Sequence, residues 1–305
     1  MLTIACRRID RVKLIRTFPT QSEMGVFNGA LYGVNVQADN KELKKQNNLK
    51  AHTTEFIRFG KGKQGGTDFR FRFLSVKKSA AIAIDFTPSM FGNDMWAEFI
   101  GAMDVLFEFG AAYVWENFRV SSLEIAYDVK AKFQGVVCIA PGVTTINSND
   151  LDKGTLYLGN EYAHRSYCIY DKRKQLFEKK KVDLPEERTR IEVTLRSLGM
   201  TLGQIVVLDR PFGNLLAVRR ELLEKLAKKY SGDVAVLNFI ESIFAGKIAQ
   251  EAYLELNSGG RKRVAQVLRQ HAFTLHSDGD VWKKWIVSQC NQLQTRFYGA
   301  TDKCN

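Results

Sequence analysis

Strict alternation of apolar and polar residues in several short segments limits the fold of this chain more than any other feature. In 69–76 (FRFRFLSV) phenylalanines alternate with arginines, and 80–88 (AAIAIDFTP) follows after a tight connection. A period of two is the side-chain period of a β-strand, so these segments predict an antiparallel hairpin. The segments 118–130 and 190–196 have the same pattern, with one apolar face and one polar face. We therefore expect a mostly antiparallel sheet.

Helical periodicity begins at 92–109 and dominates beyond residue 200, where the segments with apolar residues at helical spacing are 213–230, 233–245, 261–272 and 280–295. Strand signals are absent from that part of the chain. The predicted fold class is α+β, with a central antiparallel sheet that carries the active site on one face and a helical C-terminal part. We expect two domains, an α+β domain over 1–200 and a helical region over 201–305.

The charge balance indicates a polyanionic partner. The 305 residues include 45 lysines and arginines against 33 acids, which gives a formal net charge of +12. Nucleic acid is the expected partner, and a charge that only promotes solubility is the alternative. No apolar stretch is long enough for a membrane span, and charges interrupt the N-terminus where a secretory signal is apolar, so we expect a cytoplasmic protein. Five cysteines without a CxxC pair indicate neither a disulfide framework nor a zinc site.

Carboxylates lie on the polar faces of three predicted strands: Asp85, Glu124 with Asp128, and Glu192. Carboxylate oxygens are the ligands that Mg²⁺ or Mn²⁺ prefers, and such an ion polarises a phosphodiester. Glu124 and Asp128 are roughly 13 Å apart along a strand, so one ion does not easily bind both. The alternative is that these acids only solvate an exposed sheet face.

Tyr170 ends an apolar strand and is surrounded in sequence by cations. Arg165 precedes it, and Lys172, Arg173 and Lys174 follow. A phenol has an ordinary pKa near ~10, so as a nucleophile it needs a base or nearby positive charge. The alternative is a strand-end tyrosine with its ring in the core and its hydroxyl in water. The Gly-rich segment 60–67 (GKGKQGGT) lacks Walker spacing and predicts a basic hairpin tip instead.

Four segments together resemble the Rep_trans family of plasmid rolling-circle replication initiators. The family has a conserved tyrosine segment, an R-x-x-x-x-Y-[DEN]-K strand, an R-[VI]-E strand and two upstream acidic strands. The matching positions here are Tyr157, Gly159, Arg165, Tyr170, Asp171, Lys172, Arg190, Ile191, Glu192, Glu124, Ala126, Tyr127, Asp128, Asp85 and Pro88. Together they cover roughly 80–196. Ser122 departs from the pattern, because many members have arginine there.

The resemblance implies an enzyme that nicks and rejoins origin DNA with a topoisomerase-like chemistry. Tyr170 would form a 5′-phosphotyrosine with help from Arg165 and Lys172, and a divalent ion, Mg²⁺ or Mn²⁺, would lie on the acids. Its expected setting is the bacterial cytoplasm, where it would start plasmid or phage replication as a homodimer with a host helicase and polymerase. The helical region would help to recognise duplex and hairpin origin DNA. Candidate DNA contacts are Arg70, Arg72, Arg173, Lys174, Arg190, Arg261, Lys262 and Arg263.

Two other functions compete with this interpretation. A DNA-binding protein without nicking activity, such as a repressor or an inactive initiator, would keep the charge and the helices and have no use for Tyr170. A relaxase built on a histidine cluster is disfavoured, because the four histidines form no HxH or HxxxH pair.

Overall fold

The computed structural model describes residues 4–18, 56–59, 69–76, 79–107, 109–147, 151, 154–208, 210–272 and 279–298. The chain forms two compact units that alternate along the sequence. Unit 1 comprises Met1–Arg8, Ile125–Leu195 and Asp209–Trp282. Unit 2 comprises Ile9–Glu124, Arg196–Leu208 and Lys283–Asn305. The division at residue 200 that the sequence predicts stays a prediction.

Unit 2 contains an antiparallel run of strands in the order β2-β3-β4-β1-β5. Their bounds are β1 Ile4–Phe18, β2 Phe56–Phe59, β3 Phe69–Val76, β4 Ser79–Phe86 and β5 Arg119–Val129, and β1 and β5 also extend into unit 1. The predicted hairpin is confirmed, since Phe69 pairs with Phe86 and Phe71 with Ile84. β1 is longer than the strand that the sequence indicates at 9–15.

An aromatic core lies under the hairpin of unit 2. Helix α3, Asn93–Leu106, confirms the helix predicted at 92–109, and α4, Gly110–Asn117, follows it. Phe99 of α3 is fully buried, with its ring centroid 4.8 Å from that of Phe86 and 5.2 Å from that of Phe69. The apolar face of the hairpin therefore packs on α3. Short 3₁₀ turns η1, Pro88–Met90, and η3, Leu202–Val207, also belong to this part.

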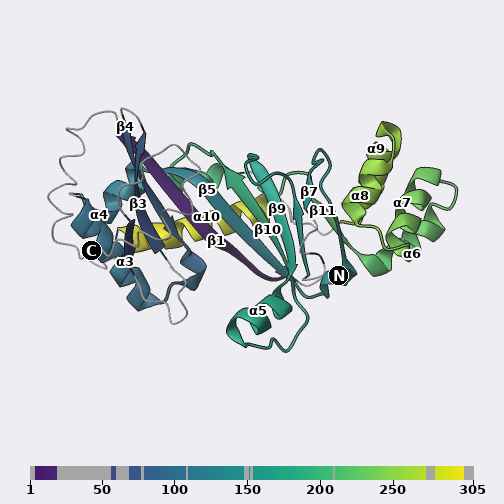
Figure 1. The fold of residues 1–305 in the computed structure, drawn as a ribbon, viewed down its shortest axis with the longest axis horizontal. Coiled ribbons are helices and arrows are strands. Elements are labelled where there is room, and N and C mark those ends of the chain that lie inside the picture. Colours follow the sequence, from purple (N-terminus) through teal and green to yellow (C-terminus); the bar gives the residue numbers. More distant parts are fainter. Residues whose placement is uncertain are drawn as a thin grey trace. The chain divides into compact units, whose positions relative to one another are not determined.

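Unit 1 contains the strand order β5-β10-β9-β8-β7. The bounds are β7 Ile146–Asn147, β8 Thr155–Leu158, β9 Arg165–Asp171 and β10 Thr189–Arg196, with α5, Lys172–Lys180, directly after β9. The register of β9 and β10 puts Tyr170 opposite Arg190 and Cys168 opposite Glu192. Figure 1 shows α5 at the end of β9 and β10. The register of β9 and β10 determines which of their polar side chains are neighbours.

The rest of unit 1 is mostly helical. After η2, Phe133–Gly135, strand β6, Val136–Ile139, pairs antiparallel with β11, Leu216–Arg219. The helices are α6 Arg220–Lys229, α7 Val234–Phe244, α8 Ala249–Glu255 and α9 Ser258–Arg269, and α10, Gly279–Phe297, continues into unit 2. The prediction of helix over the whole of 213–230 is wrong at its start. Leu216–Arg219 is extended there, because it pairs with β6.

The fold class predicted from the sequence is confirmed: the protein is α+β, with an antiparallel sheet, further helices and a mostly helical C-terminal part. The Gly-rich segment 60–67 lies outside the described residues, and so do the side chains of Arg70 and Arg72. Of the helices that the structure describes, none combines the length and the apolar character needed to cross a bilayer.

Candidate functional site

The centre of the candidate site is a hydrogen bond between Tyr170 and Glu192 in unit 1. The Tyr170 hydroxyl donates to Glu192 Oε1 across 2.7 Å. Tyr170 is the penultimate residue of β9 and lies opposite Arg190. Glu192 is two residues further along β10 on the same face, which explains why the long tyrosine side chain reaches it diagonally. Tyr170 is 6 % exposed and the Glu192 side chain is 16 % exposed, so the carboxylate is the more accessible partner.

A buried ion pair between Arg190 and Asp128 lies next to this hydrogen bond. Arg190 Nε and Nη2 donate to the two carboxylate oxygens of Asp128, at 2.5 Å and 2.9 Å. Arg190 Nη1 is also 3.6 Å from Glu192 Oε1, and Arg8 Nη2 is 3.4 Å from Asp128 Oδ2. Side chains from β1, β5, β9 and β10 thus form one chain of contacts that ends at the Tyr170 hydroxyl. Arg190 was expected to touch DNA, but its side chain is 2 % exposed and is held by Asp128.

Lys172, one of the cations predicted downstream, lies near Tyr170. Its Nζ is 5.4 Å from the centroid of the Tyr170 ring, and it donates a 2.8 Å hydrogen bond to Gln175. Lys172 holds this position because it starts α5, whose first turn is capped by Asp171 accepting from the Lys174 amide at 2.9 Å. The strand-to-helix change directly after Tyr170 therefore brings a positive charge to the phenol ring.

Arg173 of α5 forms ion pairs within the fold, and the DNA contact predicted for it stays a prediction. Its guanidinium donates to Asp183 at 2.8 Å and to Glu187 at 3.1 Å, and these ion pairs raise its pKa. Hydrogen bonding to Arg173 also lowers the pKa of Asp183 below its ordinary value. Arg173 thus ties α5 to the segment that leads into β10. Lys174 also lies on α5 and contributes the backbone amide that Asp171 caps.

Arg165 is not brought to the Tyr170 hydroxyl. The two residues are five positions apart on β9, so their side chains leave opposite faces of the strand. Arg165 Nη2 donates to the Arg210 carbonyl at 3.1 Å, and Tyr167 on the same face donates to the Phe212 carbonyl at 2.9 Å. Burial raises the pKa of Tyr167. Arg165 therefore anchors the 210–213 turn, and its predicted catalytic role stays a prediction that no contact with Tyr170 supports.

Asp85 and Glu124 belong to unit 2. Asp85 receives two 2.7 Å hydrogen bonds from Arg11, which raise the Arg11 pKa, and Glu124 adds a weaker attraction to the same guanidinium. Asp85 and Asp128 are both buried, so the alternative that they solvate an open sheet face is wrong for these two acids. Neither arginine was anticipated, because Arg8 and Arg11 lie far from their partners in sequence and have no local signal.

The carboxylates do not fit a shared metal ion as they are arranged here. Within the described residues, no three aspartate, glutamate, histidine or cysteine side chains come together as a possible metal-binding group. Asp128 already faces Arg190 and Arg8, and Asp85 faces Arg11. A guanidinium occupies the oxygens that a cation would need. The predicted Mg²⁺ or Mn²⁺ requirement therefore stays a prediction without an assigned ligand set.

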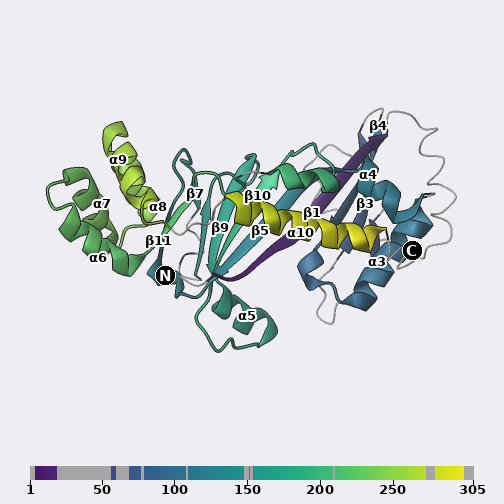
Figure 2. The same cartoon turned by 180° about the vertical axis from the view of Figure 1, so that it is seen from behind.

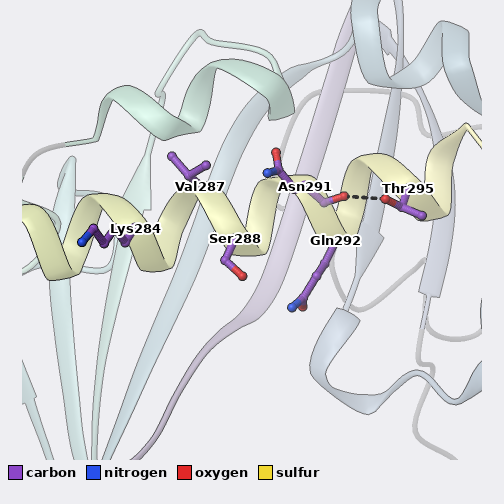
Figure 3. A pocket seen from close by; sticks show the side chains of 6 residues that line it. All are labelled: Lys284, Val287, Ser288, Asn291, Gln292 and Thr295. Carbon is purple, nitrogen blue, oxygen red and sulfur yellow. Dashed lines mark hydrogen bonds between the residues drawn. The ribbon is translucent and has the colours of Figure 1, made fainter.

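A pocket of about 440 Å³ lies along α10 in unit 2 and includes no predicted site residue. Figure 3 shows the polar and small side chains that line it, with Thr295 donating to the Asn291 carbonyl. The lining residues are Lys284, Val287, Ser288, Asn291, Gln292 and Thr295. None of these is an acid, a nucleophilic tyrosine or a histidine. The candidate chemistry therefore remains with Tyr170 and Glu192.

Comparison with known proteins yields a structural likeness only. The chain is similar to the solved structure of a rolling-circle replication initiator protein from Geobacillus stearothermophilus, with 13 % sequence identity and a TM-score of 0.32. The likeness covers 73 % of this chain and 84 % of that one. No protein family and no curated protein matches the sequence. The function must therefore be argued from the residues of this chain.

Proposed function

We propose that the protein is a replication initiator that nicks and rejoins origin DNA through a phosphotyrosine intermediate on Tyr170. One observation carries the proposal: the Tyr170 hydroxyl donates to the Glu192 carboxylate across 2.7 Å. A phenol that donates to a carboxylate has a proton acceptor in place, which is the arrangement that an activated nucleophile needs. The net charge of +12 supports a polyanionic substrate.

The proposed step is a transesterification that consumes no nucleotide cofactor. Tyr170 Oη attacks the phosphorus of a phosphodiester, the Oη–P bond forms and the bond from phosphorus to the 3′ oxygen breaks. The phenolic proton passes to Glu192, and the leaving 3′ oxygen takes a proton from water. The reverse attack by a 3′ hydroxyl on the phosphotyrosine rejoins the strand. The energy of the broken bond is kept in the phosphotyrosine.

Arg190 and Lys172 support this step in different ways. Arg190 lies between Asp128 and Glu192, so it fixes the carboxylate that accepts the proton and acts as a positioning residue. Lys172 Nζ is near the Tyr170 ring and supplies positive charge where the phenol oxygen and the phosphate become more negative. The proposal also includes a divalent cation, a homodimer, and a host helicase and polymerase. No contact in the described residues identifies where any of these would bind.

A nicking assay with three variants tests the proposal. The substrate is supercoiled plasmid with the origin of the replicon that encodes the chain, with Mg²⁺, with Mn²⁺ or with a chelator. The native protein should relax the plasmid and form a covalent protein–DNA adduct. Tyr170→Phe should lose both, and Glu192→Gln should nick about 100-fold more slowly, the low end for a lost proton acceptor. Tyr162→Phe is the matched control, because Tyr162 is 83 % exposed.

The outcomes separate the competing functions. A covalent adduct that persists in Tyr170→Phe would show that Tyr170 is not the nucleophile. DNA binding by the native protein with no nicking under any metal condition would favour the non-enzymatic alternative. Equal rates for Glu192→Gln and the native protein would show that Glu192 is not the proton acceptor, while Tyr170 could remain the nucleophile.

A further inference from the structure

The helices α6 to α9 form a core of their own within unit 1, together with β6 and β11. Figure 2 shows these four helices gathered beside β11. Apolar side chains from all of them are buried in one cluster, including Val137, Leu216, Leu226, Phe239, Tyr253, Val264 and Leu268. α9 is therefore held on one side by packing, and its other side is available to a partner.

The outer face of α9 is basic and polar without a single acid. Gly260, Val264, Val267 and Leu268 turn inward and are buried. The exposed residues recur at helical spacing on the other side, at Gly259, Lys262, Gln266 and Arg269. Arg261, Lys262 and Arg269 make no ion pair with any residue that the structure describes, so their charges are not neutralised within this part of the fold.

Arg263 differs from its neighbours, although the sequence suggests a uniform basic run. Its Nε donates to Asp233 at 2.6 Å, and its guanidinium lies 5.5 Å from the Tyr230 ring centroid. Asp233 also caps α7 by accepting from the Val236 amide. Arg263 therefore fastens α9 to the start of α7. The expectation that Arg261, Lys262 and Arg263 contact DNA stays a prediction, and of these three Arg263 is paired with an acid within the fold.

The first turn of α9 packs closely against α7. α8 ends at Glu255, and α9 begins at Ser258 after two intervening residues, with Asn257 accepting from the Gly260 amide at 2.8 Å. A Cβ on Gly260 would lie 3.3 Å from the Cβ atoms of Ala235 and Leu256, so a larger residue there would push α9 off α7. Helix-turn-helix proteins also have two consecutive helices with a short connection, and they place the second of these helices in the major groove.

We propose that α9 reads duplex DNA by lying in the major groove, with Lys262, Gln266 and Arg269 toward the base edges and Arg261 at a phosphate. The major groove accepts one α-helix, lysine and arginine pair with guanine there, and glutamine pairs with adenine. Lys262 and Arg269 are seven residues apart, roughly 10 Å at 1.5 Å per residue. That distance covers about three base pairs. The DNA ligand rests on the proposed function, but the assigned residues do not.

Duplex DNA fits this face better than an acidic protein surface does. An acidic protein surface would need only positive charge on α9. It would give no reason for Gln266 to lie between Lys262 and Arg269 at regular helical spacing. A central glutamine is a donor and an acceptor, and adenine offers both groups in the major groove. Gly259, exposed at the first turn, also leaves the backbone open to a neighbouring phosphate.

Selection from a randomised duplex library tests the proposal independently of nicking. The full-length protein is used in a Tyr170→Phe background, so that binding is measured without cleavage. The library should yield a preferred sequence. Lys262→Ala, Gln266→Ala and Arg269→Ala should each relax the preference at one or two base pairs and weaken binding to that sequence about 10-fold. Lys225→Ala on α6 is the matched control, because it removes one exposed charge and should leave the preference unchanged.

Three results would overturn the proposal. One is a library that yields no preferred duplex. Another is an unchanged preference in all three α9 variants with melting temperatures like the native protein. The third is heparin competing as well as the selected duplex, which would show a charge patch without base reading. If the native protein does not nick DNA but the Tyr170→Phe protein still selects a duplex through α9, the proposed function alone is contradicted. If the native protein nicks DNA but the α9 variants leave the selected sequence unchanged, only the role of α9 is contradicted.

Discussion

Two aspartates that look equivalent in the sequence differ in how their arginine partners meet solvent. Asp128 is bound to Arg190, and both side chains are almost fully buried, at 3 % and 2 % exposure. Asp85 is bound to Arg11, whose side chain is 48 % exposed. Removing one member of a fully buried pair leaves an uncompensated charge away from water, whereas an exposed guanidinium is solvated at once. The two acids should therefore respond differently to the same substitution.

We expect Asp128→Ala to lower the free energy of unfolding by about 3–5 kcal/mol, the typical loss when a buried pair is broken. Asp85→Ala should cost about 1 kcal/mol or less, because Arg11 can turn to water. Urea unfolding followed by circular dichroism measures both. Similar losses for the two variants would contradict the role of burial, and Asp128→Ala that cannot be purified folded would agree with the larger loss.

At the scale of elements, Asp233 and Arg263 join the start of α7 to α9. Hydrogen bonding to Arg263 lowers the pKa of Asp233 below its ordinary value of 3.8. A lowered pKa in the folded protein means that the ionised form stabilises the fold. That contribution is fully present above about pH 4 and is lost as the pH falls through the lower folded value.

Asp233→Asn should therefore lower the melting temperature at pH 7, and the difference from the native protein should close as the pH falls below about 4. Asparagine can still cap α7, so the variant tests the charge and not the cap. Melting curves from pH 7 to pH 3 check this. A difference that is constant with pH would mean that the ion pair with Arg263 does not stabilise these helices.

Elements with a strong period could be predicted from the sequence, and long-range contacts could not. β3, β4 and α3 lie within a few residues of their predicted positions because their apolar residues follow one clear spacing. β11 was missed because a short apolar run fits a strand or a helix equally well, and only its pairing with β6 decides.

The same reasoning explains the candidate site. Tyr170 and Glu192 were singled out by their strands and meet through register. The period-two rule already implies that Arg165 lies on the opposite face of β9 from Tyr170, but the motif spacing outweighed it. The burial of Arg190 against Asp128 depends on two strands 62 positions apart, which no local pattern encodes.

At the scale of the whole molecule, unit 1 is assembled from three separate stretches of chain. β6 needs β11, and Arg165 and Tyr167 need the carbonyls of Arg210 and Phe212. All of these partners lie beyond residue 200. A chain that stops at the predicted domain boundary would leave β6 with an open edge and the 165–167 side chains without their acceptors.

A shortened protein comprising residues 1–200 should therefore unfold at a lower urea concentration than the full chain, and with a broader transition. The comparison uses urea unfolding together with limited proteolysis of both proteins. A sharp transition at the midpoint of the full chain would instead support an independent domain that ends at residue 200.

The pairing of β6 with β11 also has a consequence for how the protein is made. A ribosome releases β6 long before it has translated Leu216–Arg219, so the nascent chain carries an unpaired strand edge while the intervening segments emerge. Contacts between distant positions form late and slowly. During that interval the exposed strand edge is a site at which nascent chains can misassemble.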